Sequence, residues 1–351
     1  MSFNQSMVGI ISYGTYIPKY RVRIEDIAKA WHKNPDDIIS ALSIKEKAVP
    51  NTDEDAITLA VESSVRALRT VGLDPKKLKS IFVGSESHPY AVNPSSTIIA
   101  EAIGMNNHYF SVDMKFACKA ATAAMQVTVG LLASGEIAYG LVIGSDTAQA
   151  KPHDILEYTA SSIAASYILG DDQNEIIANV LHMSSFSSNT PDFWRRDGVR
   201  YPSHFGRFTG QPAYFAHVLG EAQALLEKSQ MKPEDFDYCV FHMPNGKFPR
   251  TVATKLGFTK EQLLPSLTVD TVGNPYTASA LLGLAAVLDI AKPGAKIFFV
   301  SYGSGAGSDG FIFETTKYLP KFQKKTLPVT KQIADKEYIT YLEYLQKTHK
   351  L

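Results

Sequence analysis

Four polar residues of this chain have side chains suited to covalent chemistry at a carbonyl group. Cys118 is a potential nucleophile, Glu86 a potential acid or base, and His242 and Asn274 potential hydrogen-bond donors. The same number of residues separates Glu86 from Cys118 as separates His242 from Asn274. Equal spacing indicates two similar halves, and ligands bind where the strand ends and helix starts of such halves meet. The sequence therefore predicts a Glu, Cys, His, Asn cluster.

Cys118 follows an expected strand over 109–114 and begins an expected helix over 118–133. At a helix N-terminus, unpaired amides and the helix dipole favour the thiolate and lower the pKa of a cysteine. Cysteine is also a small hydrophobe that suits a tightly packed helix. Taken alone, this residue leaves both interpretations open.

Glu86 follows the apolar strand expected over 79–85. A partly buried glutamate has its pKa raised toward neutrality and can exchange protons, although a capping or loop role is the alternative. His242 ends the strand expected over 237–241, where a neutral imidazole could polarise a carbonyl oxygen. A histidine at a strand end is more often structural, so its match to Glu86 in the repeat carries the functional interpretation.

Asn274 lies in a Gly-Asn-Pro turn before an expected helix, and its amide could make the turn or position a histidine or an oxyanion. The glycine-rich segment 301–307 could supply amide donors to a ligand, although a hairpin explains its glycines almost as well. It lacks the following helix of a dinucleotide or P-loop site. Candidate anion contacts are Lys247, Arg250 and Arg207, with surface solvation as the alternative.

The expected elements repeat along the chain and predict an α/β fold built from two βαβαβ halves. The first pass has strands over 79–85, 109–114, 139–144 and 162–169 with helices over 94–103 and 118–133. The second has strands over 237–241, 266–270, 296–302 and 310–315 with helices over 248–256 and 277–291. In each half, one helix carries small, apolar residues on nearly every face, which is typical of a helix buried between two layers.

The repeat suggests three divisions of the chain. Residues 1–178 form the half with Glu86 and Cys118, and residues 217–351 form the half with His242 and Asn274. Residues 179–216 are rich in turn formers and read as an inserted, loop-rich segment that could cover a site or carry anion contacts. The tail, 319–351, is expected to be a surface appendage. Its basic part, 317–336, is either a docking surface or simply solvated.

Composition excludes several classes of protein. The chain has 351 residues with 35 basic and 35 acidic side chains, so no net field would attract nucleic acid or an anionic membrane. Two cysteines are too few for a disulfide framework and too far apart for a thiolate metal cage. The first eighteen residues lack a basic segment followed by an apolar run, and no apolar stretch is long enough to span a membrane. We expect a cytoplasmic protein that binds neither membrane nor nucleic acid.

The sequence around these residues resembles the thiolase superfamily over about residues 7–316. The resemblance rests on Asp-Met-Lys-Phe-Ala before Cys118, Phe-His-Met-Pro around His242 and Gly-Asn-Pro-Tyr-Thr-Ala-Ser around Asn274. Within that superfamily, Glu86 and the lack of a cysteine in 301–307 resemble the 3-hydroxy-3-methylglutaryl-coenzyme A synthases. The Ser-His-Pro-Tyr-Ala-Val-Asn-Pro segment is similar to their archaeal branch.

The resemblance implies a thiolase-like αβαβα layered fold and a condensation of acetyl-CoA with acetoacetyl-CoA and water. Cys118 would carry the acetyl group, Glu86 would remove a methyl proton, and His242 would polarise the ketone with support from Asn274. Backbone amides of Cys118 and of the segment around Ser304 would hold the oxyanion. The product would enter mevalonate and isoprenoid synthesis.

The same resemblance implies the following acyl-CoA contacts: Thr159, Arg207, Thr209, Lys247, Arg250 and Ser304. It implies no metal or other cofactor, since the coenzyme A thioesters are substrates. It also implies a homodimer or tetramer in complex with acetoacetyl-CoA thiolase through a zinc-ribbon and OB-fold bridging protein. The alternatives are a ketoacyl synthase III-like condensing enzyme and a non-catalytic scaffold of an acyl-CoA complex.

Overall fold

Two half-sheets, joined at one end, form the frame of the protein. The computed structural model describes residues 8–351 and contains a nine-stranded sheet in the order β11-β12-β13-β8-β1-β7-β6-β4-β5. Its strands are β1 Gly9–Tyr16, β4 Ser80–Gly84, β5 Phe110–Met114, β6 Tyr139–Thr147, β7 Ser162–Gly170, β8 Ala178–Thr190, β11 Tyr238–Phe241, β12 Lys296–Val300 and β13 Gly305–Thr315. Only the start of β1 pairs with β8, through Gly9 and Ile10, so the two halves of the sheet diverge from that joint.

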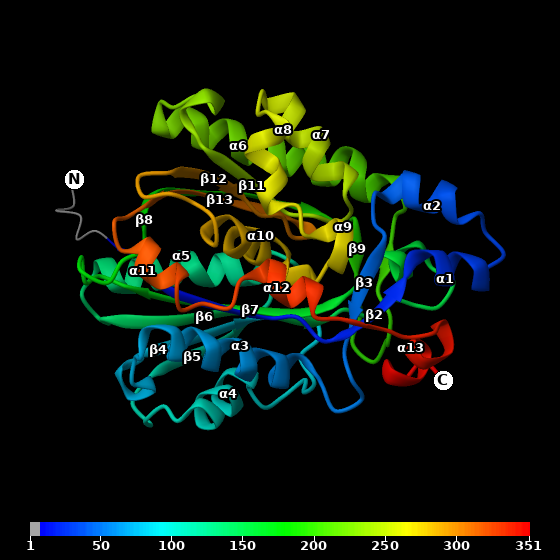
Figure 1. Ribbon diagram of the computed structural model, residues 1–351, viewed down its shortest axis with the longest axis horizontal. Coiled ribbons are helices and arrows are strands. Elements are labelled where there is room, and N and C mark those ends of the chain that lie inside the picture. Colours follow the sequence, from blue (N-terminus) through cyan, green and yellow to red (C-terminus); the bar gives the residue numbers. More distant parts are fainter. Residues whose placement is uncertain (1–7) are drawn as a thin grey trace.

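Helices complete the layers, as Figure 1 shows. Between the half-sheets lie α5 Ala120–Ala133 and α10 Ser279–Leu288. The outer helices are α3 Ala56–Val71 and α4 Ser95–Ile103 on one side, and α6 Phe215–Ser229, α7 Lys247–Leu256 and α8 Lys260–Leu263 on the other. Every residue of α10 is buried, as expected for a helix without a polar face. The predicted αβαβα layers are confirmed.

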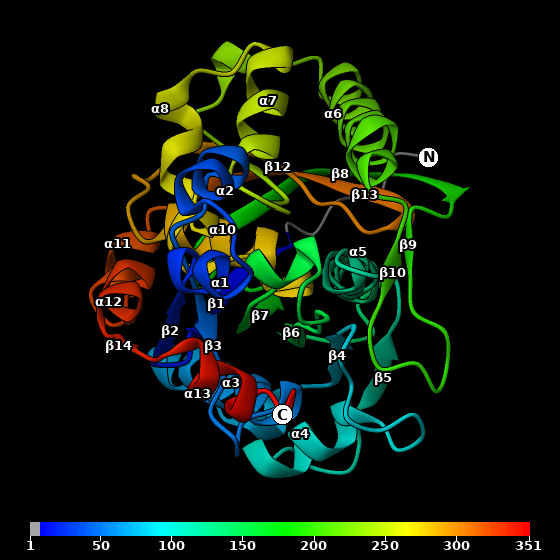
Figure 2. The same ribbon diagram turned by 90° about the vertical axis from the view of Figure 1, so that its right-hand side faces the viewer.

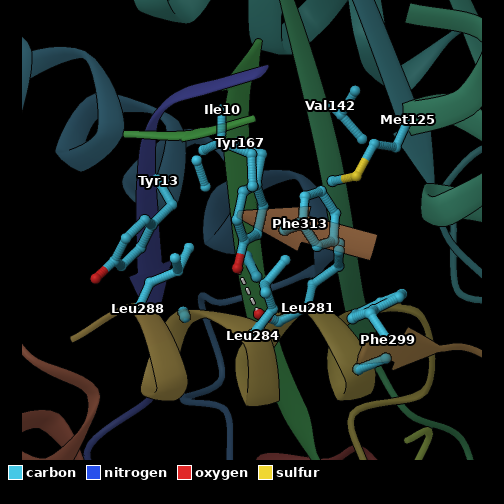
Figure 3. Close-up of a cluster of buried hydrophobic side chains, with 14 of the residues drawn as sticks. Ile10, Tyr13, Met125, Val142, Tyr167, Leu281, Leu284, Leu288, Phe299 and Phe313 are labelled. Carbon is cyan, nitrogen blue, oxygen red and sulfur yellow. Dashed lines mark hydrogen bonds between the residues drawn. The ribbon is translucent and has the colours of Figure 1, made fainter. Parts of the chain in front are cut away.

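The core between the half-sheets is packed with aromatic and aliphatic side chains around α10 (Figure 3). The hydroxyl of Tyr167 donates a 2.6 Å hydrogen bond to the backbone oxygen of Leu281. A buried tyrosine needs such a partner for its hydroxyl. This bond attaches β7, in the first half of the chain, to α10, in the second.

The prediction of a strand over 266–270 is wrong. The chain there forms the short helices η5 Leu264–Ser266 and α9 Val269–Val272. The β-branched residues suggested a strand, but Val269 and Val272 are both buried and lie three positions apart, which is a helical spacing. The second half-sheet therefore has no strand at the position that β5 occupies in the first.

The segment 179–216 is less loop-rich than predicted, because its first residues form most of β8 in the middle of the sheet. The run of serines in β8 had suggested a loop. Residues 191–209, which we call the arm, are loop-rich as predicted and contain only the short strands β9 Phe193–Trp194 and β10 Ser203–His204. The arm runs beside β5 and α5 in Figure 2 and leads into a helical stretch, η3 Thr209–Tyr214, before α6.

A small additional sheet, β2 Tyr20–Arg23, β3 Glu46–Val49 and β14 Glu337–Tyr338, joins the two ends of the chain. The remaining elements are α1 Ile24–Ala30, α2 Pro35–Leu42, η1 Pro75–Lys77, η2 Ile155–Tyr158, η4 Pro233–Asp235, η6 Tyr276–Ala278, α11 Leu319–Gln323, α12 Val329–Ala334 and α13 Tyr341–Lys347. The prediction of a surface appendage over 319–351 is wrong, because Leu319, Phe322 and Tyr344 are buried against the body. The lysines of this segment had suggested an exposed surface and drew attention away from these buried residues.

No helix within residues 8–351 is long and apolar enough to cross a membrane. The prediction for the first eighteen residues lies partly outside the described part of the chain, since residues 1–7 are not described.

Candidate active site

Cys118 stands on a tight turn between β5 and α5. Residue 117 has a φ of 42°, in the left-handed region, and the backbone nitrogen of Lys119 donates to the oxygen of Phe116 at 3.1 Å. We call residues 115–119 the nucleophile turn. The Cys118 thiol donates to Oε1 of Glu86 at 2.9 Å. The predicted nucleophile and the predicted base are therefore in direct contact.

The packing of β4 on α5 explains this contact. A Cβ added to Gly84 would lie 2.3 Å from the backbone nitrogen of Ala121, so only glycine allows the strand to approach the start of the helix this closely. Glu86 follows β4, and Cys118 precedes α5. The close approach brings the two side chains to the same point.

The environment raises the pKa of both groups. Burial raises the pKa of the Cys118 thiol well above its ordinary value, and the neighbouring Glu86 carboxylate raises it further. Of the two interpretations that the sequence left open for Cys118, the lowered pKa of a helix N-terminus is not found, because α5 begins only at Ala120 and burial raises the pKa. Burial, and then the charge of Asp146, raises the pKa of Glu86 to about 8, as predicted. Near neutral pH, the Cys118 thiol and most of the Glu86 carboxyl groups therefore both carry a proton.

The raised pKa of Glu86 has a consequence for stability. A carboxyl group with a folded pKa near 8 and an ordinary value of 4.5 destabilises the folded protein progressively as pH rises between those values. We expect Glu86→Gln to raise the melting temperature relative to the native chain at pH 8 to 9, with little difference near pH 4.5. Differential scanning calorimetry at both pH values measures this. Glu101→Gln, at an exposed position of α4, is the control, and an equal gain at both pH values would contradict the assignment.

Asp146, at the end of β6, is a site residue that the sequence analysis missed. Its Oδ1 accepts hydrogen bonds from Ser85 Oγ at 2.9 Å, Glu86 N at 2.8 Å and Ser87 Oγ at 2.7 Å. Its Oδ2 accepts from Thr277 N at 3.0 Å and Thr277 Oγ1 at 2.6 Å. Asp146 thus joins the Glu86 loop of the first half to the start of η6 in the second. The sequence signal that could have identified Asp146 is the position of an acidic residue at the end of an apolar strand.

His242 directly follows β11 and is only 2% exposed. Its backbone nitrogen donates to Val300 O at 3.0 Å, and its backbone oxygen accepts from the Tyr214 hydroxyl at 2.7 Å. Burial lowers the pKa of its imidazole to about 3, so the ring is neutral at physiological pH, as predicted. Its Nδ1 has no hydrogen-bond partner among the described residues. The ring therefore keeps unused hydrogen-bonding capacity at this nitrogen.

Tyr302 packs beside His242, with the two ring centroids 6.2 Å apart. Burial, and then the charge of Asp192, raises the pKa of the Tyr302 hydroxyl. Asp192, fully buried at the root of the arm, accepts from the Tyr302 hydroxyl at 2.7 Å and from Gly305 N at 2.8 Å. The loop-like sequence around Asp192 gave no indication that this residue belongs to the site. Asp192 anchors the glycine-rich turn, our name for residues 301–307.

Asn274 makes the predicted turn. Its Oδ1 accepts from Tyr276 N at 3.0 Å, and its backbone nitrogen donates to Thr159 O at 2.7 Å. Within residues 8–351, no group accepts a hydrogen bond from its side-chain nitrogen, so the amide can still donate to a ligand. The structure thus brings the predicted residues Thr159 and Asn274 together.

The other predicted contacts differ in their surroundings. Thr209 Oγ1 donates to Asp192 O at 3.1 Å, and Ser304 is half-buried in the glycine-rich turn. Arg207 and Lys247 are exposed. Arg250 forms a two-pronged ion pair with Asp270, with N to O distances of 3.0 and 2.5 Å, so an anion at Arg250 must share its guanidinium with this carboxylate.

The arm also touches the site directly. Arg195 Nη2 lies 3.5 Å from the backbone oxygen of Glu86, and its charge opposes the rise in the Glu86 pKa. Within the described chain, no group of three or more His, Cys, Asp or Glu side chains could hold a metal ion. The described residues include a thiol, a carboxyl group of matched pKa, a neutral imidazole and the unbonded side-chain amide of Asn274, which are groups that acyl transfer and carbon-carbon bond formation use.

Comparison with known proteins identifies the family. A family model for the C-terminal part of 3-oxoacyl-[acyl-carrier-protein] synthase III matches residues 226–315. The hydroxymethylglutaryl-CoA synthase of Archaeoglobus fulgidus is 50% identical over 345 residues, covering 98% of this chain and 99% of that protein. The synthase of Methanopyrus kandleri is 50% identical and covers 98% of each chain.

Solved structures share the fold. MvaS in complex with 3-hydroxy-3-methylglutaryl coenzyme A superimposes with a TM-score of 0.89 at 23% identity, covering 98% of this chain and 92% of the other. An HMG-CoA synthase complexed with CoA gives a TM-score of 0.89 at 22% identity, covering 97% and 90%. With these full-length relatives, the chain belongs to the hydroxymethylglutaryl-CoA synthases, condensing acyl-transferring enzymes of the thiolase-like fold.

Proposed function

We propose that this chain condenses acetyl-CoA with acetoacetyl-CoA and water to give 3-hydroxy-3-methylglutaryl-CoA and CoA, through an acetyl group carried on Cys118. The observation that carries the proposal is the 2.9 Å hydrogen bond from the Cys118 thiol to Glu86. A thiol of raised pKa needs a base in contact with it, and a carboxyl group with a pKa of about 8 is well matched to proton exchange near neutral pH.

Acetyl transfer comes first. The Cys118 sulfur attacks the carbonyl carbon of acetyl-CoA while its proton passes to Glu86. Backbone amides of Cys118 and of the glycine-rich turn hold the oxyanion. The carbon-sulfur bond to coenzyme A then breaks, and the leaving thiolate takes the proton from Glu86. Glu86 is a carboxylate again when the acetyl group is in place.

Condensation follows on the acetylated enzyme. Glu86 removes a proton from the acetyl methyl group, and the resulting enolate attacks the ketone carbon of acetoacetyl-CoA. Neutral His242, supported by Asn274, donates to the ketone oxygen, which takes its proton from Glu86 as the new bond forms. Water then releases the thioester from Cys118. The family resemblance adds that the product feeds the mevalonate pathway.

The test is an intact-protein mass measurement on the native chain. After mixing with acetyl-CoA alone, we expect one acetyl group per chain, lost when acetoacetyl-CoA is added as hydroxymethylglutaryl-CoA appears. Discharge only by a malonyl thioester would favour the ketoacyl synthase alternative. No adduct, together with alkylation of Cys118 by iodoacetamide that stays slow even above pH 8, would favour the non-catalytic scaffold.

His242→Ala separates the two steps. We expect the acetyl adduct to form at nearly the native rate, because the proposed acetylation does not use the imidazole. Condensation should fall by about 10² to 10³-fold, the usual effect of losing one donor to a developing oxyanion. Stopped-flow mass analysis with each substrate in turn measures both rates. Equal losses in the two steps would contradict the assignment of His242 to the ketone.

Asp146→Asn tests the electrostatic control of Glu86. The Asp146 charge raises the pKa of Glu86, so an uncharged side chain of the same shape should lower it from about 8. Because condensation needs Glu86 as a carboxylate, the acidic limb of the pH-rate profile should move to lower pH. A profile of kcat against pH for both proteins measures the shift. An unmoved limb would show that Asp146 acts only through its hydrogen bonds.

For substrate binding, we propose that the acyl-CoA contacts are Thr159, Arg207, Thr209, Lys247, Arg250 and Ser304, the residues that the family resemblance implies. For assembly, we propose a homodimer or tetramer, supported by β5, an edge strand with Phe110 54% and Val112 37% exposed. A complex with a thiolase and a zinc-ribbon and OB-fold protein remains a proposal from that resemblance. The two free cysteines fit the proposed cytoplasmic location.

A further inference from the structure

A buried ion pair lies directly beside the nucleophile. Lys119 Nζ is 2.6 Å from Asp309 Oδ1, and the two side chains are only 5% and 1% exposed. Asp309 also accepts from Thr122 Oγ1 at 2.7 Å and from Ser185 Oγ at 2.7 Å. One carboxylate of β13 therefore holds the residue after Cys118, the first turn of α5 and the strand β8 together.

The Lys119 side chain runs along the glycine-rich turn to reach this partner. A Cβ added to Gly303 would lie 2.8 Å from both the backbone nitrogen and Cγ of Lys119, and 2.5 Å from Phe116 O. A Cβ added to Gly307 would lie 3.1 Å from Lys119 Cε. Gly303 and Gly307 are themselves closed by reciprocal 2.8 Å backbone hydrogen bonds. The nucleophile turn and the glycine-rich turn are thus packed in van der Waals contact along the lysine.

Stability does not explain a pair this deeply buried. Removing a lysine and a carboxylate from water carries a desolvation penalty that their attraction does not reliably offset, and well-packed apolar residues often serve equally well. What the pair does provide is a fixed position. Two opposite charges shielded from water tolerate little change in their separation, because their attraction is strong in a medium of low dielectric constant.

We infer that Lys119 and Asp309 are positioning residues that set the oxyanion hole of the acetylation step. The inference rests on the proposed function, in which amides of the nucleophile turn and of the glycine-rich turn bind the same oxygen. These amides come from distant parts of the chain. Lys119 to Asp309 links the nucleophile turn to β13 two residues beyond the glycine-rich turn, and the backbone oxygen of Asp309 accepts a 2.9 Å hydrogen bond from the nitrogen of Ser301 in that turn. Catalytic geometry must be held to within about 0.5 Å by packing and hydrogen bonds around the catalytic groups, and the buried pair with its bonds to Thr122 and Ser185 supplies both here.

The experiment compares two reactions of Cys118. Alkylation by iodoacetamide needs the thiol and Glu86 but no oxyanion hole, whereas acetylation by acetyl-CoA needs all three. The double variant Lys119→Met/Asp309→Asn removes both charges at similar volume, and the amide oxygen that it leaves at position 309 can still accept from Thr122. We expect acetylation to slow by about 10²-fold, as when an oxyanion donor is lost, with alkylation within about twofold of the native rate.

Asp309→Glu is the second variant, because it keeps both charges and lengthens the link by one methylene group. We expect it to slow acetylation by about tenfold without slowing alkylation, and it decides the question if the double variant does not fold. The control is Lys336→Met/Glu46→Gln, which removes another largely buried ion pair, in the small sheet. It should leave both rates unchanged.

Three results would overturn the inference. Native acetylation in the variants would show that the pair only fills space. A parallel loss of alkylation would show that Lys119 acts on the thiol itself. A loss of acetylation in the control pair as well would show a general effect on the fold. The proposed function fails separately, through the absence of any acetyl adduct on the native chain.

Discussion

Cys118→Ala is expected to lower the rate of condensation by at least about 10⁴-fold and to abolish the acetyl adduct, because the side chain that carries the acyl group is absent. The loss should appear in kcat, since acyl-CoA binding does not need the sulfur. Intact-protein mass spectrometry after mixing with acetyl-CoA, together with a steady-state assay for released CoA, measures both effects.

The chain offers a matched control in its second cysteine. Cys239 is fully buried in β11 among apolar residues, so Cys239→Ala should still take up one acetyl group. An adduct that persisted in Cys118→Ala but disappeared in Cys239→Ala would reverse the assignment. An adduct that persisted in both variants would place the acyl group on another kind of side chain.

Glu86→Gln is expected to uncouple the two halves of the reaction. Condensation should fall by about 10⁴-fold or more, because an amide cannot remove a proton from the acetyl methyl group. Acetylation should slow less, since hydroxide or a leaving thiolate can also deprotonate Cys118, and the acetylated enzyme should accumulate. Rapid-quench mass analysis with acetyl-CoA, followed by acetoacetyl-CoA, resolves the trapped adduct.

The matched variant is Glu86→Asp, which keeps a carboxylate base on a side chain that is shorter by one methylene group, so the base lies farther from the acetyl methyl group. It should recover part of the condensation rate and lose the direct contact with Cys118. Exchange of deuterium from solvent into the acetyl methyl group is the most direct measure of proton removal. Exchange at the native rate in Glu86→Gln would assign that step to another residue.

These expectations depend on a pair of groups that is inactive until substrate arrives. Burial keeps Cys118 as a thiol, which is a weak nucleophile and resists oxidation. Contact with Glu86 supplies the base at the moment of attack. We therefore expect slow alkylation of the resting enzyme that accelerates as pH approaches and passes about 8, where Glu86 becomes ionised.

The sequence alone determined the principal features of this site. Equal spacing of two residue pairs predicted that Glu86, Cys118, His242 and Asn274 belong to one cluster, and the structure brings Glu86 and Cys118 into contact. The two expected helices with small, apolar residues on nearly every face predicted a buried middle layer, and α5 and α10 form that layer. Such features are readable because periodicity and spacing are properties of the local chain.

Only the tertiary structure decided the electrostatics. The pKa of Cys118 is raised and not lowered, because desolvation depends on which distant segments cover the thiol, and no local pattern reports that cover. Asp146 and Asp192 were missed for the same reason, since each acts through hydrogen bonds to residues far away in the chain. The Lys119 to Asp309 pair joins segments that no local pattern associates. Folding created these contacts, and with them the chemical character of the nucleophile.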